Sequence, residues 1–506
     1  MDSSQYISNS FKSFSPSVVM RPVFPPRTPK SLRFIFHSAL SLVVILWLRS
    51  WQNWIGYEWN YSEHPRLQQT IFEGTGIGGS EYRRMIFKFP TNTRVNSVGW
   101  HIPSTWIEQA GELPNDLTTS PKTTLEAAHL AFYLARSQDR YITNSTIPLI
   151  LHQSWHSMTP QSWSPLLKNY VESWLAVCDG EQPNHDDGNL DEMAYIMWDN
   201  IGIDLFIEQY ESDFWQSYIS MPIQVERVDA FRVAVLRWFG GVYSDVDTMP
   251  LRHPVTWIEP IDCEPWEDEA ENSTYSLSSV SDGPIYSPPS SASPLYLNLY
   301  EMSANGSLRV GKSPAVGAIV GIEADIAPET DAYWRAGYQY PLQITQWSLA
   351  LAPHHPISTR FIASVDMDVK TLQREDRLLD AYAVDLTGPV QFTKVIKEWL
   401  ELVAGLRWNA LTGMHDDGKS KTVADVLVLP ITGFSPGRAS LANRGSKPIT
   451  DHSARLLHQF QGSWRGSFDL VTEYGKMCRT LFGKCRSWSK DSSASKKAKK
   501  TKKSWS

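Results

Sequence analysis

A helix-to-strand transition near the middle of this 506-residue sequence constrains its fold more than any other feature. Apolar residues recur at helical spacing from Ala230 to Phe239, and the glycine pair Gly240 and Gly241 ends that run. A short apolar strand begins at once with Val242. A helix that leads directly into a buried strand indicates an α/β core.

Two aspartates separated by one residue, Asp245 and Asp247, follow this strand. In an extended chain the side chains at i and i+2 leave the same face, so both carboxylates can bind one divalent cation. Open α/β folds place their ligands beyond the carboxyl ends of strands. The pattern therefore predicts a Mn²⁺ or Mg²⁺ site, although the same spacing also occurs by chance, as at Asp366 and Asp368.

Short apolar runs alternate with amphipathic ones along the rest of the chain. This alternation predicts an α/β fold with a mostly parallel central sheet. The predicted helices, besides the one before the aspartates, are 125–140, 164–177 and 340–351, and the predicted strands are 147–153, 195–198, 315–324 and 423–429.

An uncharged apolar segment, 34–48, lies near the N-terminus, and Trp51, Trp54 and Ile55 extend it as an aromatic belt. We expect residues 34–55 to form a signal-anchor transmembrane helix; a cleaved signal peptide or a buried helix are the alternatives. Basic residues predominate before it, which predicts a cytoplasmic tail at 1–33 and a lumenal body. The short span suits the thinner membranes of the early secretory pathway, so we expect a single-pass type II membrane protein there; the family resemblance described below narrows the expected location to the Golgi membrane.

Composition divides the lumenal body into three parts. Residues 56–145 are predicted to be a stem, and 146–466 the main folded domain. Within that domain, 262–307 is first acidic and then rich in Ser and Pro, which predicts a flexible insertion. Residues 467–506 are predicted to be a disordered Lys-rich tail.

The charge balance argues against nucleic acid as a partner. The net charge is −7, and the tail holds six lysines between Lys496 and Lys503, so the remainder carries about −13. A folded part with that balance lacks the basic surface that nucleic-acid binding requires. Two phosphate-loop patterns, at 74–79 and 306–313, lack the strand before and the helix after that such loops need.

Two further features fit a lumenal location. Four N-x-S/T sequons follow the predicted anchor, at Asn60, Asn144, Asn272 and Asn305. The four cysteines could form one or two disulfides in an oxidising lumen, with three pairings open and reduced thiols also possible. They are Cys178, Cys263 and the sequence neighbours Cys478 and Cys485, which are plausible partners of each other.

The stretch R-V-D-A-F-R-x7-G-G-V-Y-S-D-V-D resembles the signature of glycosyltransferase family 32, which includes fungal α-1,6-mannosyltransferases. The resemblance runs from about Ile147 to Trp464. Several spaced elements carry it: 147–155, 198–199, 321–325, 343–347 and 387–389. Three others resemble in particular the initiation-specific (outer-chain) α-1,6-mannosyltransferases: 408–413, 425–437 and 458–464.

The resemblance implies a GT-A type nucleotide-sugar-binding fold, a GDP-mannose donor and retention of the anomeric configuration. It implies that Asp245 and Asp247 hold the metal, with Asp247 the more direct ligand. Asp229 and Arg232 match the family's D-x-x-R pair, which would contact the donor sugar hydroxyls and the diphosphate. Their spacing places both on one helix face; alternatively, Asp229 caps that helix and Arg232 merely pairs with it.

Other positions receive roles only from the resemblance. His458 is the candidate third metal or phosphate ligand, and Ser463 and Trp464 would close over the diphosphate. Trp155 either lines the nucleotide pocket or packs in the core. Asp199 is a candidate for binding the base or the ribose.

The expected function is therefore a metal-dependent, retaining Golgi mannosyltransferase, with Asp245, Asp247 and Arg232 as the catalytic residues. It would move mannose to an N-glycan core in α-1,6 linkage, alone or in a mannosyltransferase complex. The alternatives are transfer to an inositol-phosphoceramide lipid and a non-catalytic scaffold role in a mannan-polymerising complex. The sequence departs from the family pattern at 353–356, P-H-H-P in place of P-G-H-P, and in the insertion, which puts the acceptor in doubt.

Overall fold

The computed structural model describes residues 99–156, 163–181, 190–278, 287–289, 291–304, 314–437 and 445–459. The predicted cytoplasmic tail, membrane anchor and Lys-rich tail lie outside these ranges, as do Ser463, Trp464, Cys478 and Cys485. No helix in the described ranges is long and apolar enough to cross a membrane.

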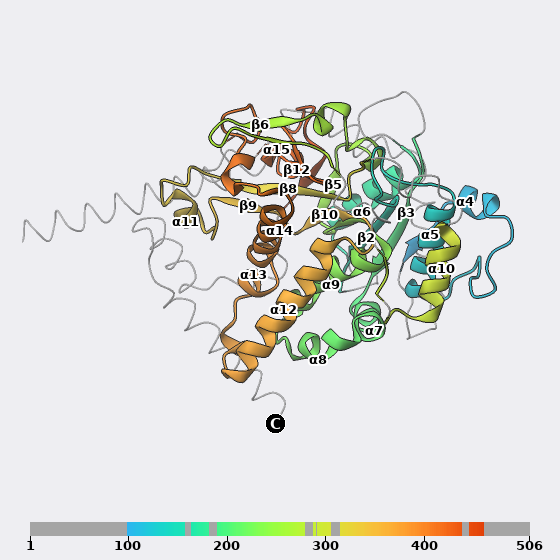
Figure 1. Ribbon diagram of the computed structural model, residues 1–506. Coiled ribbons are helices and arrows are strands. Elements are labelled where there is room, and N and C mark those ends of the chain that lie inside the picture. Colours follow the sequence, from blue (N-terminus) through green and yellow to red (C-terminus); the bar gives the residue numbers. More distant parts are fainter. Residues whose placement is uncertain are drawn as a thin grey trace, which may run out of the picture. The chain divides into compact units, whose positions relative to one another are not determined.

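The centre of the fold is a nine-stranded sheet (Figure 1) with the order β1-β3-β2-β4-β10-β8-β12-β11, in which β9 also pairs with β8. Its strands are β1 (Trp100–His101), β2 (Ile150–Ser154), β3 (Ala194–Trp198), β4 (Gly241–Ser244), β8 (Ala318–Asp325), β9 (Leu342–Ile344), β10 (Ser348–Leu351), β11 (Lys421–Val423) and β12 (Val426–Leu429).

The sheet is mixed, so the prediction of a mostly parallel sheet was wrong, whereas the α/β class is confirmed. Strands β3, β2 and β4 run parallel, as do β8 and β12. Strand β10 lies antiparallel between β4 and β8 and joins the two parallel groups. Both β9 and β10 come from the segment 340–351, which the sequence predicted to be a helix.

Helices cover both faces of this sheet. In Figure 1, α7, α8, α9 and α12 lie together below the strands, while α15 packs on β8 and β12 and α6 packs on β3. The helices are α4 (Ser104–Gln109), α5 (Thr124–Ser137), α6 (Pro165–Cys178), α7 (Asn200–Tyr210), α8 (Ser212–Ser220), α9 (Gln224–Phe239), α10 (Pro294–Ala304), α11 (Ala332–Ala336), α12 (Pro356–Arg374), α13 (Ala383–Leu386), α14 (Pro389–Ala404) and α15 (Ile431–Phe434), with short 3₁₀ turns at Pro254–Thr256, Pro260–Cys263, Leu378–Asp380 and Trp408–Leu411.

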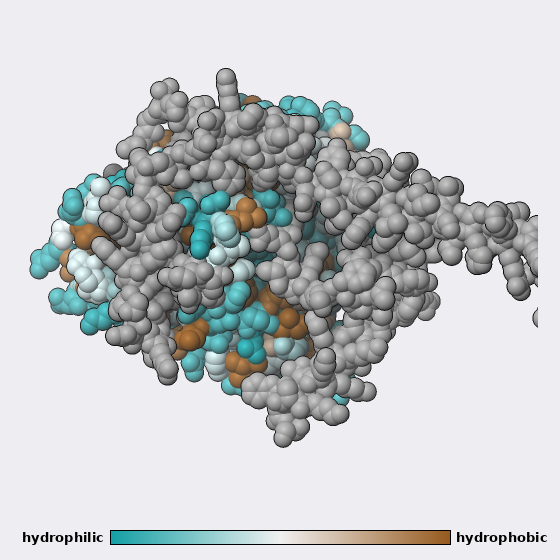
Figure 2. All heavy atoms as spheres, turned by 180° about the vertical axis from the view of Figure 1, so that it is seen from behind, coloured by the Kyte–Doolittle hydropathy of each residue, from teal (hydrophilic) through white to brown (hydrophobic). Residues whose placement is uncertain are grey.

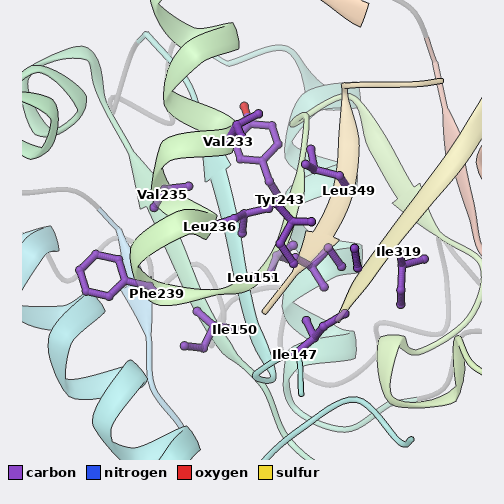
Figure 3. Close-up of a cluster of buried hydrophobic side chains, with 14 of the residues drawn as sticks. Ile147, Ile150, Leu151, Val233, Val235, Leu236, Phe239, Tyr243, Ile319 and Leu349 are labelled. Carbon is purple, nitrogen blue, oxygen red and sulfur yellow. The ribbon is translucent and has the colours of Figure 1, made fainter. Parts of the chain in front are cut away.

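Helix α9 is the main helix behind the site-bearing strands. Figure 3 shows its side chains Leu236 and Phe239 close to Ile150 of β2 and Tyr243 of β4. These residues are fully buried, and burying an aliphatic or aromatic side chain contributes about 1.5–3 kcal/mol. The packing therefore holds α9 firmly against the strands that lead to the aspartates.

The turn from α9 into β4 requires glycine. Gly240 ends the helix at φ 64°, and Gly241 has φ 98°. A Cβ on Gly241 would lie 2.3 Å from the carbonyl oxygen of Ile150, a distance that no side chain tolerates. The glycine pair thus allows β4 to pair closely with β2 immediately after the helix.

The folded domain begins before the predicted boundary at 146. Strand β1 pairs with β3 at the sheet edge, and α5 packs on the sheet with Phe132 and Leu134 fully buried. Residues 99–145 are therefore part of the core rather than of a stem.

The described residues of the predicted flexible insertion, 262–307, include regular secondary structure. Strands β6 (Trp266–Asp268) and β7 (Ser273–Tyr275) form a hairpin, and α10 packs on α5. Arg407 donates to the buried carboxylate of Asp268 with both Nε and Nη2. This ion pair joins the hairpin to a residue 139 positions away, which local composition does not reveal.

The surface opposite to the view of Figure 1 is mainly hydrophilic where described residues are visible, and its hydrophobic side chains form separate patches (Figure 2). Apolar burial is thus concentrated in the single large core around the sheet.

Candidate active site

Three parallel strands end at one edge of the sheet, and the predicted site residues follow them. In the strand register, Ser154 lies beside Trp198 and His152 beside Tyr243. The Tyr243 hydroxyl and the Ser154 hydroxyl are hydrogen-bonded at 2.8 Å. Trp155, Asp199 and Asp245 therefore leave the carboxyl ends of β2, β3 and β4 at the same edge, as parallel topology requires.

Asp245, Asp247 and His458 form a cluster of three possible metal ligands. Their ligand atoms all lie within 4.8 Å of one another, and His458 Nε2 is 3.1 Å from Asp247 Oδ1. Ligand atoms that share a divalent cation at about 2.0–2.6 Å are separated by no more than about twice that distance. Two carboxylates and one imidazole suit Mn²⁺ and related ions, so the donor set fits the predicted metal.

A small second sheet brings His458 to the aspartates. Strand β5 (Thr248–Pro250) directly follows Asp247, and it pairs antiparallel with β13 (Leu456–His458), which places His458 opposite Thr248. The indole of Trp347 stacks on the imidazole with ring centroids 4.2 Å apart. The position of His458 is thus set by strand pairing and by an aromatic contact.

Arg232 links this cluster to Asp229. Its Nη2 lies 3.0 Å from Asp229 Oδ1 and 3.3 Å from Asp245 Oδ1, which confirms that Asp229 and Arg232 share one face of α9. Asp229 lies within the helix, five residues after its first residue, so it does not cap it. Their roles in donor binding remain predictions.

Burial is the largest influence on the pKa values of the two aspartates beside Arg232. It raises the pKa of Asp229 to about 6, although Arg232 opposes the shift. It also raises the pKa of Asp245, again against the effect of Arg232. Burial alone would lower the pKa of Arg232, but Asp245 and Asp229 raise it above its usual value. The guanidinium thus stays charged and holds the two carboxylates in a water-poor environment.

Two other predicted donor-binding residues have local roles. Asp199 caps α7, because its Oδ1 accepts a hydrogen bond of 2.7 Å from the Gly202 amide, and burial raises the pKa of its carboxyl group. Trp155 is half-buried at the sheet edge and contacts the ring of His156. Whether either residue binds a nucleotide remains a prediction.

Several residues of the site were not singled out from the sequence. Gln346, Trp347 and Thr387 surround Asp229 and His458, and Tyr243 lies under the Arg232 guanidinium, 5.3 Å from Cζ to the ring centroid. The first three occur in the elements 343–347 and 387–389 that resemble the glycosyltransferase family, which was the available signal. The thiols Cys178 and Cys263 lie within the described residues and are free.

Comparison with known proteins bears on this geometry. Residues 164–269 match the family described as "Glycosyltransferase sugar-binding region containing DXD motif". This part of the chain is similar to the DXD-containing glycosyltransferases. The matched region of this family includes Asp229, Arg232, Asp245 and Asp247, whereas His458 lies outside it.

The curated relatives reported below are mannosyltransferases by name. The chain is 30% identical over 266 residues to the "Initiation-specific alpha-1,6-mannosyltransferase" of Schizosaccharomyces pombe. This alignment covers 52% of each chain. It is 26% identical over 334 residues to the protein of the same name in Candida albicans, covering 60% of this chain and 72% of that one. It is 27% identical over 122 residues to "Inositol phosphoceramide mannosyltransferase 3" of S. pombe, covering 23% and 30%.

The chain thus spans about half the length of the first S. pombe relative. Among solved structures, "PaToxG Glycosyltransferase" aligns over 58% of this chain and 87% of that one, with 13% identity and a TM-score of 0.24, a likeness too weak to support an inference.

Proposed function

We propose that this DXD glycosyltransferase is a metal-dependent, retaining mannosyltransferase with a GT-A fold. It moves mannose from GDP-mannose to an N-glycan core in α-1,6 linkage, and it works in the Golgi lumen as a single-pass type II membrane protein. The observation that supports this most is the cluster of Asp245, Asp247 and His458 joined through Arg232 to Asp229. The names of the two relatives that match over more than half of this chain support mannose transfer and the α-1,6 linkage.

Each side chain has a defined part in this proposal. Asp245, Asp247 and His458 would hold the cation, which when bound supplies positive charge beside the leaving diphosphate. Arg232 adds a fixed positive charge next to Asp245. Asp229 accepts hydrogen bonds from hydroxyls of the donor sugar. Preorganised charges of this kind act strongly because the site is buried.

We propose front-side transfer as the chemical step. The bond between the anomeric carbon and the diphosphate oxygen breaks, and a bond forms on the same face to the acceptor hydroxyl oxygen. The hydroxyl proton passes to the departing diphosphate, so no enzyme base is needed. Detection of a mannosyl-enzyme adduct by mass spectrometry would replace this route with double displacement.

The decisive experiment assays the purified full-length protein with GDP-mannose, UDP-glucose and UDP-galactose side by side, with a high-mannose N-glycan as acceptor. We expect transfer only from GDP-mannose, its loss in EDTA and its recovery with Mn²⁺. Asp247→Ala should abolish transfer. Asp368→Asn changes an aspartate of the same D-x-D spacing on α12, where it accepts a hydrogen bond from Gln391, and should leave activity intact.

Two results would overturn the proposal. Absence of both GDP release and mannose transfer with every acceptor supports a non-catalytic role, such as a scaffold subunit. Transfer to inositol phosphoceramide but not to the N-glycan supports the lipid-directed alternative, which the shorter match to the S. pombe inositol phosphoceramide enzyme brings into the test.

A further inference from the structure

Asp229 is held from behind by two residues that lie far away in the sequence. Gln346 is 117 positions downstream and Thr387 is 158 positions downstream. Gln346 and Thr387 are fully buried, and Asp229 is buried with them. These contacts involve Asp229 and not the atoms of the candidate metal cluster.

Gln346 connects α9 to the segment that follows α13. Its side-chain Nε2 donates to the carbonyl oxygen of Asp229 at 3.2 Å and to that of Thr387 at 2.7 Å. Both partners are carbonyl oxygens, which only accept, so the carboxamide nitrogen must face them. One side chain therefore fixes the backbones of Asp229 and Thr387 relative to each other.

Thr387 in turn contacts the Asp229 side chain. Its hydroxyl lies 3.3 Å from Asp229 Oδ2 and 3.3 Å from the carbonyl oxygen of Ala383. A hydroxyl carries one proton, and an ionised carboxylate is the stronger acceptor, so the proton is directed to Asp229 when that group is charged. Arg232 holds the other oxygen, Oδ1. The carboxylate is thus fixed at both oxygens and cannot rotate freely.

The backbone at Thr387 is itself rigid. Its amide donates to Ala383 at 3.0 Å, and a Cβ on the next residue, Gly388, would lie 2.7 Å from the Cα of Val384. The glycine therefore permits the close turn between α13 and α14. This turn places the Thr387 hydroxyl against Asp229 without help from a flexible side chain.

We propose that Thr387 and Gln346 are positioning residues that orient the Asp229 carboxylate toward the donor sugar. A carboxylate has about four acceptor positions, and Arg232 and Thr387 occupy one on each oxygen. The remaining positions then point in a fixed direction and accept sugar hydroxyls. This inference rests on the proposed function, because it assigns the sugar contact to Asp229.

The test compares Thr387→Val, which keeps the shape and removes the hydroxyl, with Thr387→Ser, which keeps the hydroxyl. For Thr387→Val we expect kcat/KM for GDP-mannose to fall about 10–100-fold, the range for one or two lost hydrogen bonds to a charged group. The affinities for GDP and for Mn²⁺ should stay unchanged, because the proposal assigns only the hydroxyls of the donor sugar, which GDP and Mn²⁺ lack, to Asp229. Thr387→Ser should recover activity to within about threefold, and Gln346→Met should act like Thr387→Val.

Two controls separate positioning from a general loss of stability. Thr393→Val removes a fully buried hydroxyl that accepts from the Ile344 amide, away from Asp229, and should leave kcat/KM unchanged. In an Asp229→Asn background, Thr387→Val should cause no further loss, because coupled residues are not additive.

The outcomes are distinct. The inference is wrong if Thr387→Val transfers mannose as fast as the unchanged protein, or if it loses GDP and Mn²⁺ binding together with activity. A protein that transfers no sugar at all before any substitution contradicts the proposed function, and this inference with it.

Discussion

The imidazole Nε2 of His458 lies 3.1 Å from the carboxylate Oδ1 of Asp247, although the two residues are 211 positions apart. This contact brings His458, the last residue of β13, into the candidate metal cluster. A third ligand supplied by a strand rather than by a loop is held in place by backbone pairing. The geometry of the cluster is therefore set before a cation arrives.

Replacing His458 by alanine should weaken Mn²⁺ binding by more than the roughly 10–100-fold that loss of an outer-shell partner costs, because it removes one of the three candidate ligands. Excess Mn²⁺ should restore part of the transfer activity. Calorimetric titration with Mn²⁺ measures the affinity. The matched control is His452→Ala in the same segment, since that imidazole is 79% exposed. Equal Mn²⁺ affinity in both variants would remove His458 from the ligand set.

The glycine pair should be sensitive to a single added methyl group. Gly241→Ala places a Cβ against the Ile150 carbonyl oxygen and should destabilise the protein by at least 3 kcal/mol, the upper range for overpacking. Gly405→Ala is the control, because Gly405 also has a positive φ, 63°, but its Cβ would meet nothing within 4 Å. Gly405→Ala therefore causes backbone strain alone, which should lower the free energy of unfolding by about 1 kcal/mol. Chemical denaturation compares the two, and similar losses would contradict the steric argument.

Phe132 tests the position of the domain boundary. It is fully buried on α5, so Phe132→Ala should cost about 3–5 kcal/mol of unfolding free energy. Leu402→Ala, at a side chain that is 64% exposed on α14, should cost little. If residues 99–145 were a stem, both substitutions would be harmless.

Glu226 should make stability fall as the pH rises. Burial raises its pKa to about 7 from 4.5, so between those values the folded protein keeps a proton that the unfolded chain has lost. The free energy of unfolding therefore decreases across this window, by about 3 kcal/mol for this group, and the full loss is present above pH 7.

Glu226→Gln removes this titration. The glutamine carbonyl can still accept from the Ile223 amide, as Glu226 Oε2 does at 3.2 Å. Relative to the unchanged protein, the variant should gain stability steadily from pH 4.5 to 8 in urea titrations. A stability difference that is the same at every pH would show that Glu226 does not titrate in this way.

Local patterns in the sequence were sufficient for the part of the fold around the D-x-D pair. The helix, the glycine pair and β4 are local features, and each is decided by residues within about 25 positions. The predicted strands at 147–153, 195–198 and 315–324 correspond to β2, β3 and β8, with boundaries that differ by a few residues. The Asp229–Arg232 pair follows from helical spacing alone.

The segment 340–351 shows why the remainder was not predictable. Its strands β9 and β10 are buried on both faces, so the alternation that marks a half-exposed strand is absent. The insertion of β10 between β4 and β8 then reverses the direction of one central strand, which no local pattern encodes. His458 was reached only through family resemblance, because its contact with Asp247 depends on pairing between β5 and β13.

The pairing of β5 with β13 also has a consequence for when activity first arises during synthesis. A ribosome that has released the chain through β12 has supplied every strand of the central sheet, but His458 has not yet been made. The D-x-D carboxylates then lack their third ligand and the stacked imidazole. Loop closure over such a sequence separation is slow and occurs late, so on the proposed function a nascent chain would fold its core before its metal site is complete.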